Sequence, residues 1–164
     1  MDKVSVGVRM ERGEVLRLEI CHSTAVDKYI IENHYLHSAP AGAKLRLWVK
    51  GDDNNIIGAM MWGRPSARTY DPVRILENTR MYMVDGTEPC AESKALGMAR
   101  KLIRTQLPQV KGLIAYTSTG EMHKGTIYLA DGWFAVGQTV AKAWNKKDRK
   151  NIDISKKIRF VRSA

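Results

Sequence analysis

One segment of the chain could hold a phosphate group. Lys94, Gly97 and Ala99 follow a turn-rich stretch and lie at the start of the strongest helical pattern in the sequence. A helix N-terminus presents unpaired backbone N–H groups and the positive end of the helix dipole, which together suit a pyrophosphate. Gly97 and Ala99 would let a ligand come close. Both residue types are common in helices, so close packing of a neighbouring element is the alternative.

A second segment could supply an acid. Tyr128 stands four residues before Gly132, which is followed by Trp133. We expect Gly132 to end a short helix in the left-handed conformation and Trp133 to begin a strand. The phenol of Tyr128 could protonate a leaving group. It could also be a core ring whose hydroxyl is hydrogen-bonded.

Three further side chains, an arginine, a histidine and a tyrosine, could take part in catalysis or substrate binding. Arg80, on a predicted strand, could clamp a phosphate or carbonyl oxygen in bidentate fashion, or pair with an acidic residue. His123 precedes a short helix and titrates near neutrality, so it could be a base or a helix cap. Tyr35, next to His34, ends the first predicted helix, where an acceptor could enter or the ring could simply pack.

The elements that must position these residues form a mixed pattern. Apolar alternation predicts a hairpin at 45–50 and 56–62, and strand–helix–strand crossovers in the second half favour parallel pairing there. We therefore predict an α/β fold: a single domain with a mixed central sheet flanked by helices. Residues 3–21 are expected to form a first strand or hairpin. The other expected strands are 79–84, 113–117 and 133–140, with a terminal strand that includes Ile152, Ile154, Ile158 and Phe160. The expected helices are 25–35, 93–107 and 125–130, and 64–74 is expected to be a loop.

The positive charge is concentrated near the end of the sequence. Of the formal net charge of +10, residues 142–162 carry nine basic and two acidic side chains. Such a block is either a solvated tail or a surface that contacts nucleic-acid phosphates, and we favour the second because Trp144 and Phe160 suit base stacking. The loop 64–74 adds two arginines. The predicted nucleic-acid contacts are Arg64, Arg68, Lys146, Lys147, Arg149 and Lys150.

Length and composition narrow the class of protein. The 164 residues suit one domain, and 44% hydrophobic with 27% charged residues is ordinary for a globular chain. The longest uncharged apolar run, 56–63, is far shorter than the roughly 20 residues of a membrane span. Cys21 and Cys90 fit neither a disulfide framework nor a paired zinc site. We expect a cytoplasmic protein of one domain over 1–164, without metal or membrane association, that ends in a basic segment, 142–164.

The order of strand, Lys94-to-Ala99 segment, helix, strand and Tyr128-to-Trp133 segment resembles the GNAT acyltransferase superfamily. The resemblance implies a splayed central sheet with an acyl donor held between the strands near 81–84 and 113–117. It also implies that Lys94, Gly97 and Ala99 bind the donor. Lys94 stands where this superfamily usually has Arg or Gln. Acetyl-coenzyme A is the donor that the superfamily implies, and an aminoacyl-tRNA is the alternative.

Several short motifs narrow the resemblance to the phage Mom family of DNA-modification proteins, over roughly residues 30 to 140. They are His34-Tyr35, Gly63-Arg64, Glu77-Asn-Thr-Arg80 and His123-Lys-Gly-Thr-Ile-Tyr128-x-x-x-Gly132-Trp133. The resemblance implies that an acyl-derived, carbamoylmethyl-type group is added to the exocyclic amine of adenine in DNA, which blocks restriction. Ser118 stands where the family is expected to have Asp. If that Asp is the base, either another group does its work here or the activity of this chain is altered.

Together these points predict catalytic roles for five residues and DNA as the main partner, with tRNA as an additional one. The residues are Tyr35, Arg80, Ser118, His123 and Tyr128. Because the adenine amine is paired inside the duplex, such an enzyme must flip the base or act on an unpaired strand. Two alternatives stay open: an N-acyltransferase for a protein, small-molecule or aminoacyl-tRNA amine, and a nucleic-acid-binding protein without activity.

Overall fold

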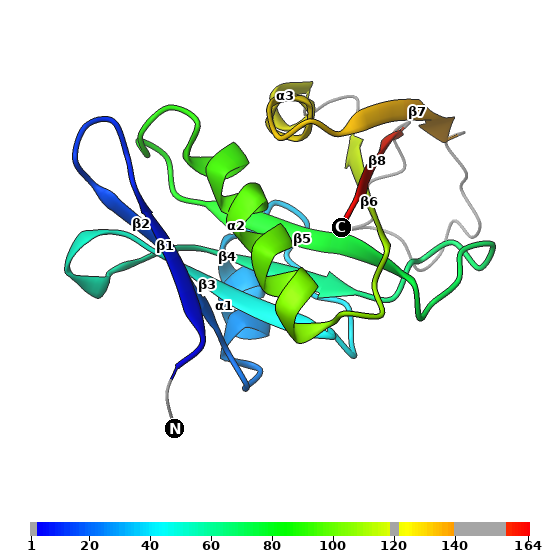
Figure 1. Cartoon of the computed structure of the whole chain (residues 1–164), viewed down its shortest axis with the longest axis horizontal. Coiled ribbons are helices and arrows are strands. Elements are labelled where there is room, and N and C mark those ends of the chain that lie inside the picture. Colours follow the sequence, from blue (N-terminus) through cyan, green and yellow to red (C-terminus); the bar gives the residue numbers. More distant parts are fainter. Residues whose placement is uncertain (1–2, 119–121, 140–156) are drawn as a thin grey trace.

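The computed structural model describes residues 3–118, 122–139 and 157–164 (Figure 1). The predicted contacts of Lys146, Lys147, Arg149 and Lys150 lie outside the described residues, as does the side chain of His123. The described helices are α1 (Ala25–Asn33), η1 (Asp52–Asn54), α2 (Ala91–Gln106) and α3 (Met122–Ala130). The described strands are β1 (Ser5–Arg9), β2 (Val15–Ile20), β3 (Leu45–Lys50), β4 (Ile56–Gly63), β5 (Ile75–Met83), β6 (Gly112–Ser118), β7 (Phe134–Thr139) and β8 (Lys157–Ser163).

Within that part of the chain, the strands form one mixed sheet in the order β1-β2-β3-β4-β5-β6-β8-β7. β5 and β6 pair in parallel, and the other neighbours pair antiparallel. The chain passes from β5 to β6 through α2, as a parallel crossover requires. Figure 1 shows α2 in front of the sheet and α1 behind it. The α/β prediction, with a mixed sheet flanked by helices, is therefore confirmed.

Alternation along β4 explains how the sheet holds a helix on each face. Met60 is wholly buried in the core shared with α2, whereas Ala59 and Met61 are buried against α1. Successive side chains of a strand point to opposite faces, so β4 must be apolar on both. Within the described residues, α2 contributes one apolar stripe to the first of these cores, made of Ala91, Ala95, Leu96, Met98, Ala99, Leu102 and Ile103.

Some element bounds differ from those predicted. β5 begins at Ile75 rather than at 79, because Ile75 to Asn78 pair with Gly112 to Ala115 of β6. That pairing joins residues far apart in sequence, and the polar Glu77 and Asn78 hide it from a hydrophobic pattern. α1 ends at Asn33, two residues early, and His34 is extended. The terminal strand is present as β8, between β6 and β7; the expected contributions of Ile152 and Ile154 lie outside the described residues.

β5 and β6 separate after four residue pairs. Their ladder stops at Asn78 and Ala115, while β5 continues to Met83 and β6 to Ser118. β5 also carries an extra residue against β4 at this point, because Met61 pairs with Arg80 and Trp62 pairs with Asn78. A bulge of this kind bends and twists its strand. The two strand ends therefore diverge and leave room for side chains between them.

Gly58 is required by the close approach of β4 and β5. A Cβ atom at this position would lie 2.3 Å from the carbonyl oxygen of Tyr82 and 2.9 Å from Cγ of Met83. We expect Gly58→Ala to lower the free energy of unfolding by about 1–3 kcal/mol through overpacking, measured by urea denaturation. Gly63→Ala in the same strand is the control, since its nearest neighbour would be 3.7 Å away. Equal stability of the two variants would contradict this account.

Candidate active site

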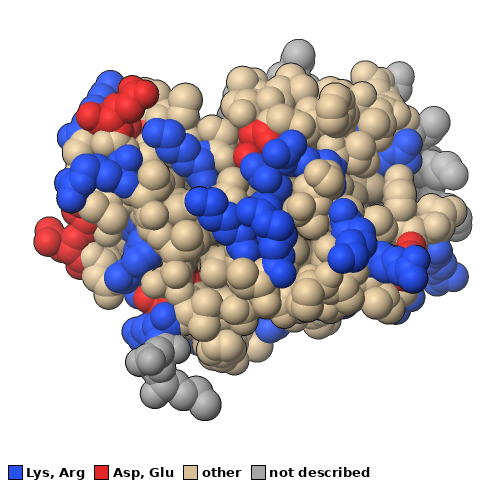
Figure 2. Space-filling model, in the orientation of Figure 1, with Lys and Arg blue, Asp and Glu red and all other residues tan. Residues whose placement is uncertain are grey.

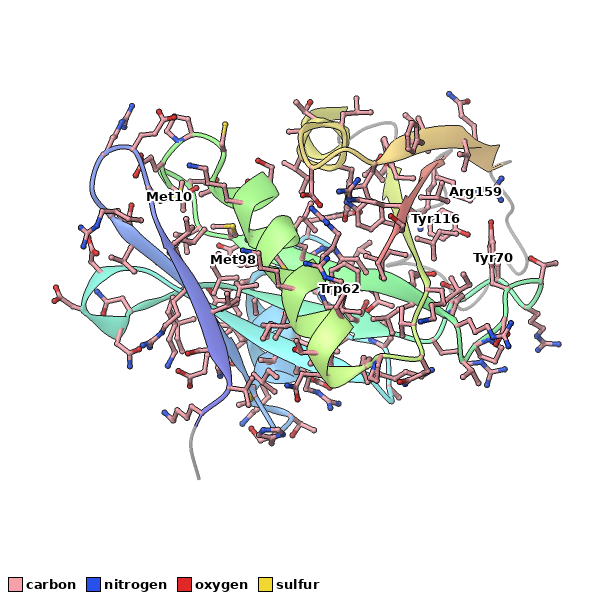
Figure 3. All side chains as sticks on the ribbon, viewed as in Figure 1. Met10, Trp62, Tyr70, Met98, Tyr116 and Arg159 are labelled. Atoms are coloured by element: carbon pink, nitrogen blue, oxygen red, sulfur yellow. The ribbon has the colours of Figure 1, made fainter. Side chains whose placement is uncertain are left out.

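A cavity of about 440 Å³ lies between the diverging ends of β5 and β6. The chain after α1 forms one wall. The starts of α2 and β8 contribute one side chain each, and the middle of α3 contributes two. The residues that carry the argument below are Tyr35, Ser66, Glu77, Asn78, Arg80, Tyr116, Ser118 and Tyr128. Figure 3 shows Tyr116 and Arg159 near this region, from the paired strands β6 and β8.

Four of the predicted catalytic residues line this one cavity. Tyr128, Ser118 and Arg80 come from α3, β6 and β5, and Tyr35 from the chain after α1. Tyr128 and Ser118 are both 5% exposed, whereas Tyr35 is 41% exposed and stacks on His34 with ring centroids 4.6 Å apart. Tyr35 is therefore accessible at the surface, while Tyr128 and Ser118 are enclosed. Their catalytic roles remain predictions.

Arg80 is held by the chain segment after α1. Its Nε donates to the carbonyl oxygen of Ser38 at 2.9 Å, and one terminal nitrogen donates to the Ser38 hydroxyl at 3.1 Å. The other terminal nitrogen donates to the carbonyl oxygen of Thr79 at 2.7 Å. Burial lowers the pKa of Arg80 below its ordinary value, and Tyr35 and Glu77 oppose that shift. Arginine stays protonated in proteins, so the cavity contains a fixed positive charge.

Tyr128 is an enclosed, neutral phenol. Its hydroxyl lies 3.1 Å from the Asn78 amide, whose other end faces the carbonyl oxygens of Met61 at 3.2 Å and Arg80 at 3.0 Å. The end that faces two carbonyls must be the NH₂ group, so the Asn78 oxygen accepts from Tyr128. Burial raises the pKa of Tyr128 well above its ordinary value, against the lowering effect of that hydrogen bond. The hydroxyl therefore keeps its proton at neutral pH and can donate it.

The packing around the Tyr128 ring explains the spacing of Tyr128, Gly132 and Trp133. Its ring stacks on Phe160 of β8 at 5.4 Å and meets Trp133 edge-on at 5.0 Å. Gly132 has a φ of +80°, and this left-handed residue turns the chain so that the Trp133 N–H donates to the carbonyl oxygen of Tyr128 at 2.9 Å. Tyr128 can therefore be a core residue and a proton donor at once, because its ring packs in the core while its hydroxyl lines the cavity.

Glu77 is a buried carboxylate in the same cavity. It is 6% exposed and accepts hydrogen bonds from the backbone N–H of Ser66 at 3.1 Å and from its hydroxyl at 2.8 and 3.1 Å. Burial raises the pKa of Glu77 above its ordinary value; the Ser66 hydrogen bonds oppose this most, followed by the charges of Arg80 and Lys157. A carboxylate balanced in this way is suited to accept a proton.

The sequence reasoning did not assign a catalytic role to Glu77, Asn78 or Tyr116. Glu77 and Asn78 belong to the Glu77-Asn-Thr-Arg80 motif noted above, so the sequence did contain a signal that they could be functional. Tyr116 had none, because it lies in an apolar strand. Burial raises the pKa of Tyr116, with Glu77 and Tyr70 acting in the same direction, while Arg159 opposes the shift through its charge and a hydrogen bond.

The structure places the predicted donor-binding residues outside this cavity. Ala99 is completely buried in the core, and Gly97 faces the end of α3, where an added Cβ would lie 3.3 Å from Oδ1 of Asp131. Close helix packing, the alternative for the two small residues, therefore accounts for both. Lys94 lies in the first turn of α2 and is half-buried. Its role toward a donor remains a prediction.

A second cavity, of about 280 Å³, lies at the start of α2. Its lining shows whether the diphosphate of coenzyme A would fit there. Its described lining includes Glu88 and Glu92 but neither lysine nor arginine, and Pro89 has no N–H to offer. One oxygen of the buried Glu88 has no hydrogen-bond partner. Negative charge at this helix start opposes a diphosphate. The lining fits an uncharged acyl arm better than a diphosphate.

A third cavity, of about 300 Å³, is formed by the loop between β4 and β5. Arg64 and Arg68 line it and are exposed, and their contact with phosphates remains a prediction. Ser66 lines both this cavity and the large one. Hydrogen bonds hold the loop near both of its ends. The Ser66 hydroxyl donates to Glu77 of β5, and the Lys44 ammonium donates to the carbonyl oxygen of Pro72.

Solved structures with the same architecture define the class of fold. A ribosomal-protein-S5-alanine acetyltransferase from Vibrio fischeri superposes with a TM-score of 0.66 at 10% identity, covering 96% of each chain. A GNAT family acetyltransferase from Elizabethkingia anophelis with acetyl-CoA bound gives 0.63 at 12% identity, over 91% of this chain and 98% of that one. The GNAT domain of S. lividans PAT gives 0.64 at 10% identity, over 98% and 97%. The fold is that of the GNAT acetyltransferases.

The sequence then identifies the family within this fold. Residues 15–159 match the Mom protein family, and because this is most of the chain, the protein belongs to that family. No curated protein sequence matches that of the chain. Over the residues that the structure describes, no helix is both long and apolar enough to cross a membrane.

Proposed function

We propose that this protein transfers an acyl-derived group to the exocyclic amine of adenine in DNA. The observation that carries the proposal is one cavity containing a buried carboxylate, a fixed guanidinium and a neutral phenol, in a member of the Mom family. An amine acceptor must lose a proton, an acyl carbonyl develops negative charge, and a leaving group gains a proton. Each requirement has a matching side chain here.

The proposed reaction assigns one task to each group. The adenine nitrogen attacks the acyl carbon, forming a C–N bond that gives an N-acyl adenine as the first product, and Glu77 accepts the proton that this nitrogen releases. Arg80 stabilises the negative charge on the acyl oxygen. When the bond to the leaving group breaks, Tyr128 donates its proton to that group. In the resting site the Tyr128 hydroxyl donates to the Asn78 oxygen at 3.1 Å, so the O–H rotates from Asn78 toward the leaving group when it gives up its proton.

Ser118 does not supply the base in this proposal, and Tyr35 has a positioning task. Ser118 is enclosed at the end of β6, where the family resemblance led us to expect Asp. Glu77, from the neighbouring strand, supplies the missing carboxylate. Tyr35 lies exposed at the side where α1 ends and can contact an extruded base. A base must leave its stack to reach an enclosed carboxylate, which favours a flipped or unpaired adenine.

Charge supports a polyanionic substrate. Figure 2 shows Lys and Arg side chains gathered across the face that α2 covers, with few acidic side chains among them. Exposed cations on α2 include Lys101 and Arg104. Arg64 and Arg68 lie in the loop that shares Ser66 with the main cavity. Phosphates beside the modified adenine would then contact these two arginines.

We expect DNA affinity to fall steeply with salt, and Arg64→Ala combined with Arg68→Ala to weaken binding. Each lost phosphate contact should reduce the slope of log K against log salt by about one. Fluorescence anisotropy with a labelled single-stranded oligonucleotide between low and moderate salt measures both effects. Arg9→Ala is the matched control, because this exposed arginine lies on β1, at the far edge of the sheet from the cavity. An unchanged slope in the double variant would exclude the loop as a phosphate contact.

Mass spectrometry of nucleosides tests the proposed reaction directly. Plasmid DNA is isolated from cells that express the parent chain or its Tyr128→Phe, Arg80→Ala variant. A heavier deoxyadenosine found only with the parent supports the proposal, and its mass identifies the added group. Unmodified DNA alongside well-folded, abundant protein would overturn it, and acceptor amines of proteins and small molecules would be screened next.

A further inference from the structure

The loop that carries Arg64 and Arg68 is bonded directly to the carboxylate in the main cavity. Ser66 supplies its backbone N–H and its hydroxyl to Glu77, at 3.1 Å and at 2.8 and 3.1 Å respectively. Ser66 also lines the arginine-bearing cavity. A single residue therefore joins the wall of the expected phosphate site to the group that we propose as the base.

An enclosed carboxylate such as Glu77 needs hydrogen-bond donors or opposite charge to be ionised. A carboxylate that is 6% exposed loses most of its hydration, and the loss must be offset by donors or by opposite charge. Arg80 is close enough to act through its charge, but the hydrogen bonds described for its guanidinium are made to Ser38 and Thr79. The groups that face Glu77 from other elements are Lys157 of β8, Tyr116 of β6 and Tyr128 of α3.

We infer that Ser66 is a positioning residue that keeps Glu77 ionised and fixed in the cavity, so that the base is ready only while the Arg64–Arg68 loop is seated against β5. The ionised form accepts stronger hydrogen bonds than the protonated form, so ionisation and seating of the loop favour each other. Linkage is reciprocal, and a polyanion that holds the loop in place therefore also favours the ionised base. The catalytic consequence rests on the proposed function; the Ser66–Glu77 link does not.

Removing the Ser66 hydroxyl should make Glu77 harder to ionise. In Ser66→Ala the backbone N–H remains as a donor, but the hydroxyl bonds at 2.8 and 3.1 Å are lost. Burial, which already raises the pKa of Glu77, is then opposed less. Ser66→Thr restores a hydroxyl in the same position and should restore the parent behaviour.

A titration without substrate tests the inference. The side-chain carboxyl carbons of ¹³C-labelled glutamate are followed by NMR against pH, and the Glu77 signal is assigned by its loss in Glu77→Gln. We expect the midpoint for Glu77 to move to higher pH in Ser66→Ala and to return in Ser66→Thr. Ser23→Ala is the matched control, because this exposed serine bonds the backbone at the start of α1 rather than Glu77 or Arg80. An unchanged midpoint in Ser66→Ala would overturn the inference.

The pH dependence of DNA modification gives the second readout. Ser66→Ala should lose activity mainly at the acidic side of the profile and approach the parent rate at higher pH, where Glu77 is ionised in both proteins. A uniform loss at every pH would indicate a merely structural role and would contradict the inference. If the parent itself modifies no DNA, the proposed function fails, while the titration still decides the role of Ser66.

Discussion

Replacing Glu77 with glutamine is expected to reduce the rate of acyl transfer by about 10²–10⁴-fold, the usual contribution of a general base. The amide keeps an oxygen that can accept from Ser66, so the loop and the cavity should retain their geometry. The variant loses only the ability to take the proton from the attacking amine. Single-turnover modification of an adenine-containing oligonucleotide measures the effect.

The matched control is Glu32→Gln, an exposed carboxylate on α1. Its rate should equal that of the parent. If Glu77→Gln reacts at the parent rate, Glu77 is not the base. The carboxylate that the Mom resemblance leads us to expect at Ser118 would then have no replacement in the proposed reaction.

The same substitution should stabilise the fold at neutral pH. Burial raises the pKa of Glu77 in the folded state, so between the ordinary glutamate value and the raised value the folded chain binds more protons than the unfolded one. The free energy of unfolding of the parent then falls as pH rises through that window. Glu77→Gln lacks this titration. Its stability relative to the parent should grow with pH, as urea denaturation across pH will show, and a pH-independent difference would contradict this view.

Replacing Asp131 with alanine is expected to cost about 3 kcal/mol of folding free energy, at the lower end of the range for a broken buried ion pair. Asp131 accepts two hydrogen bonds from Arg100 of α2, at 2.7 and 2.9 Å, and one from the indole N–H of Trp133 at 2.9 Å. Their side chains are 16% exposed for Arg100 and 7% for Asp131. Alanine would leave the Arg100 guanidinium and the indole N–H largely enclosed without this acceptor.

Chemical denaturation measures this cost, and activity adds a second observable. α3 carries Tyr128, and Asp131 fastens the end of α3 to α2, so DNA modification should fall along with stability. Glu32→Ala, at the exposed surface of α1, is the control and should change stability little. A loss below about 1 kcal/mol in Asp131→Ala would mean that the pair is an ordinary surface ion pair.

The local pattern of the sequence was sufficient for most of the fold. β3 and β4 have the predicted bounds to within one residue, because their alternation and polar turn are local features. α2 has the predicted apolar stripe, and Gly132 ends α3 because only a left-handed residue makes that turn without strain. The motifs around Tyr128 also carried enough information to indicate the family.

The tertiary structure decided which residues share the site. The parallel pairing of β5 with β6 joins chain segments 37 residues apart along the sequence, at Ile75 and Gly112, and long-range pairing leaves no local pattern. That pairing, and its end at Asn78, opens the cavity and encloses Glu77. It also places Ala99 in the core, where a motif at a helix start had indicated a ligand contact.

Sequence and tertiary structure determine different properties of a site, for a physical reason. A residue type and its spacing determine what a side chain is able to do, so Tyr128, Arg80 and Tyr35 could be singled out from the sequence. Whether a carboxylate is hydrated or enclosed depends on the strands that pack around it, and this decides whether Glu77 is an ordinary surface acid or a base. The sequence by itself therefore determined the family, most of the elements and most of the groups that we propose for the reaction, whereas the contact between Ser66 and Glu77 came only from the folded chain.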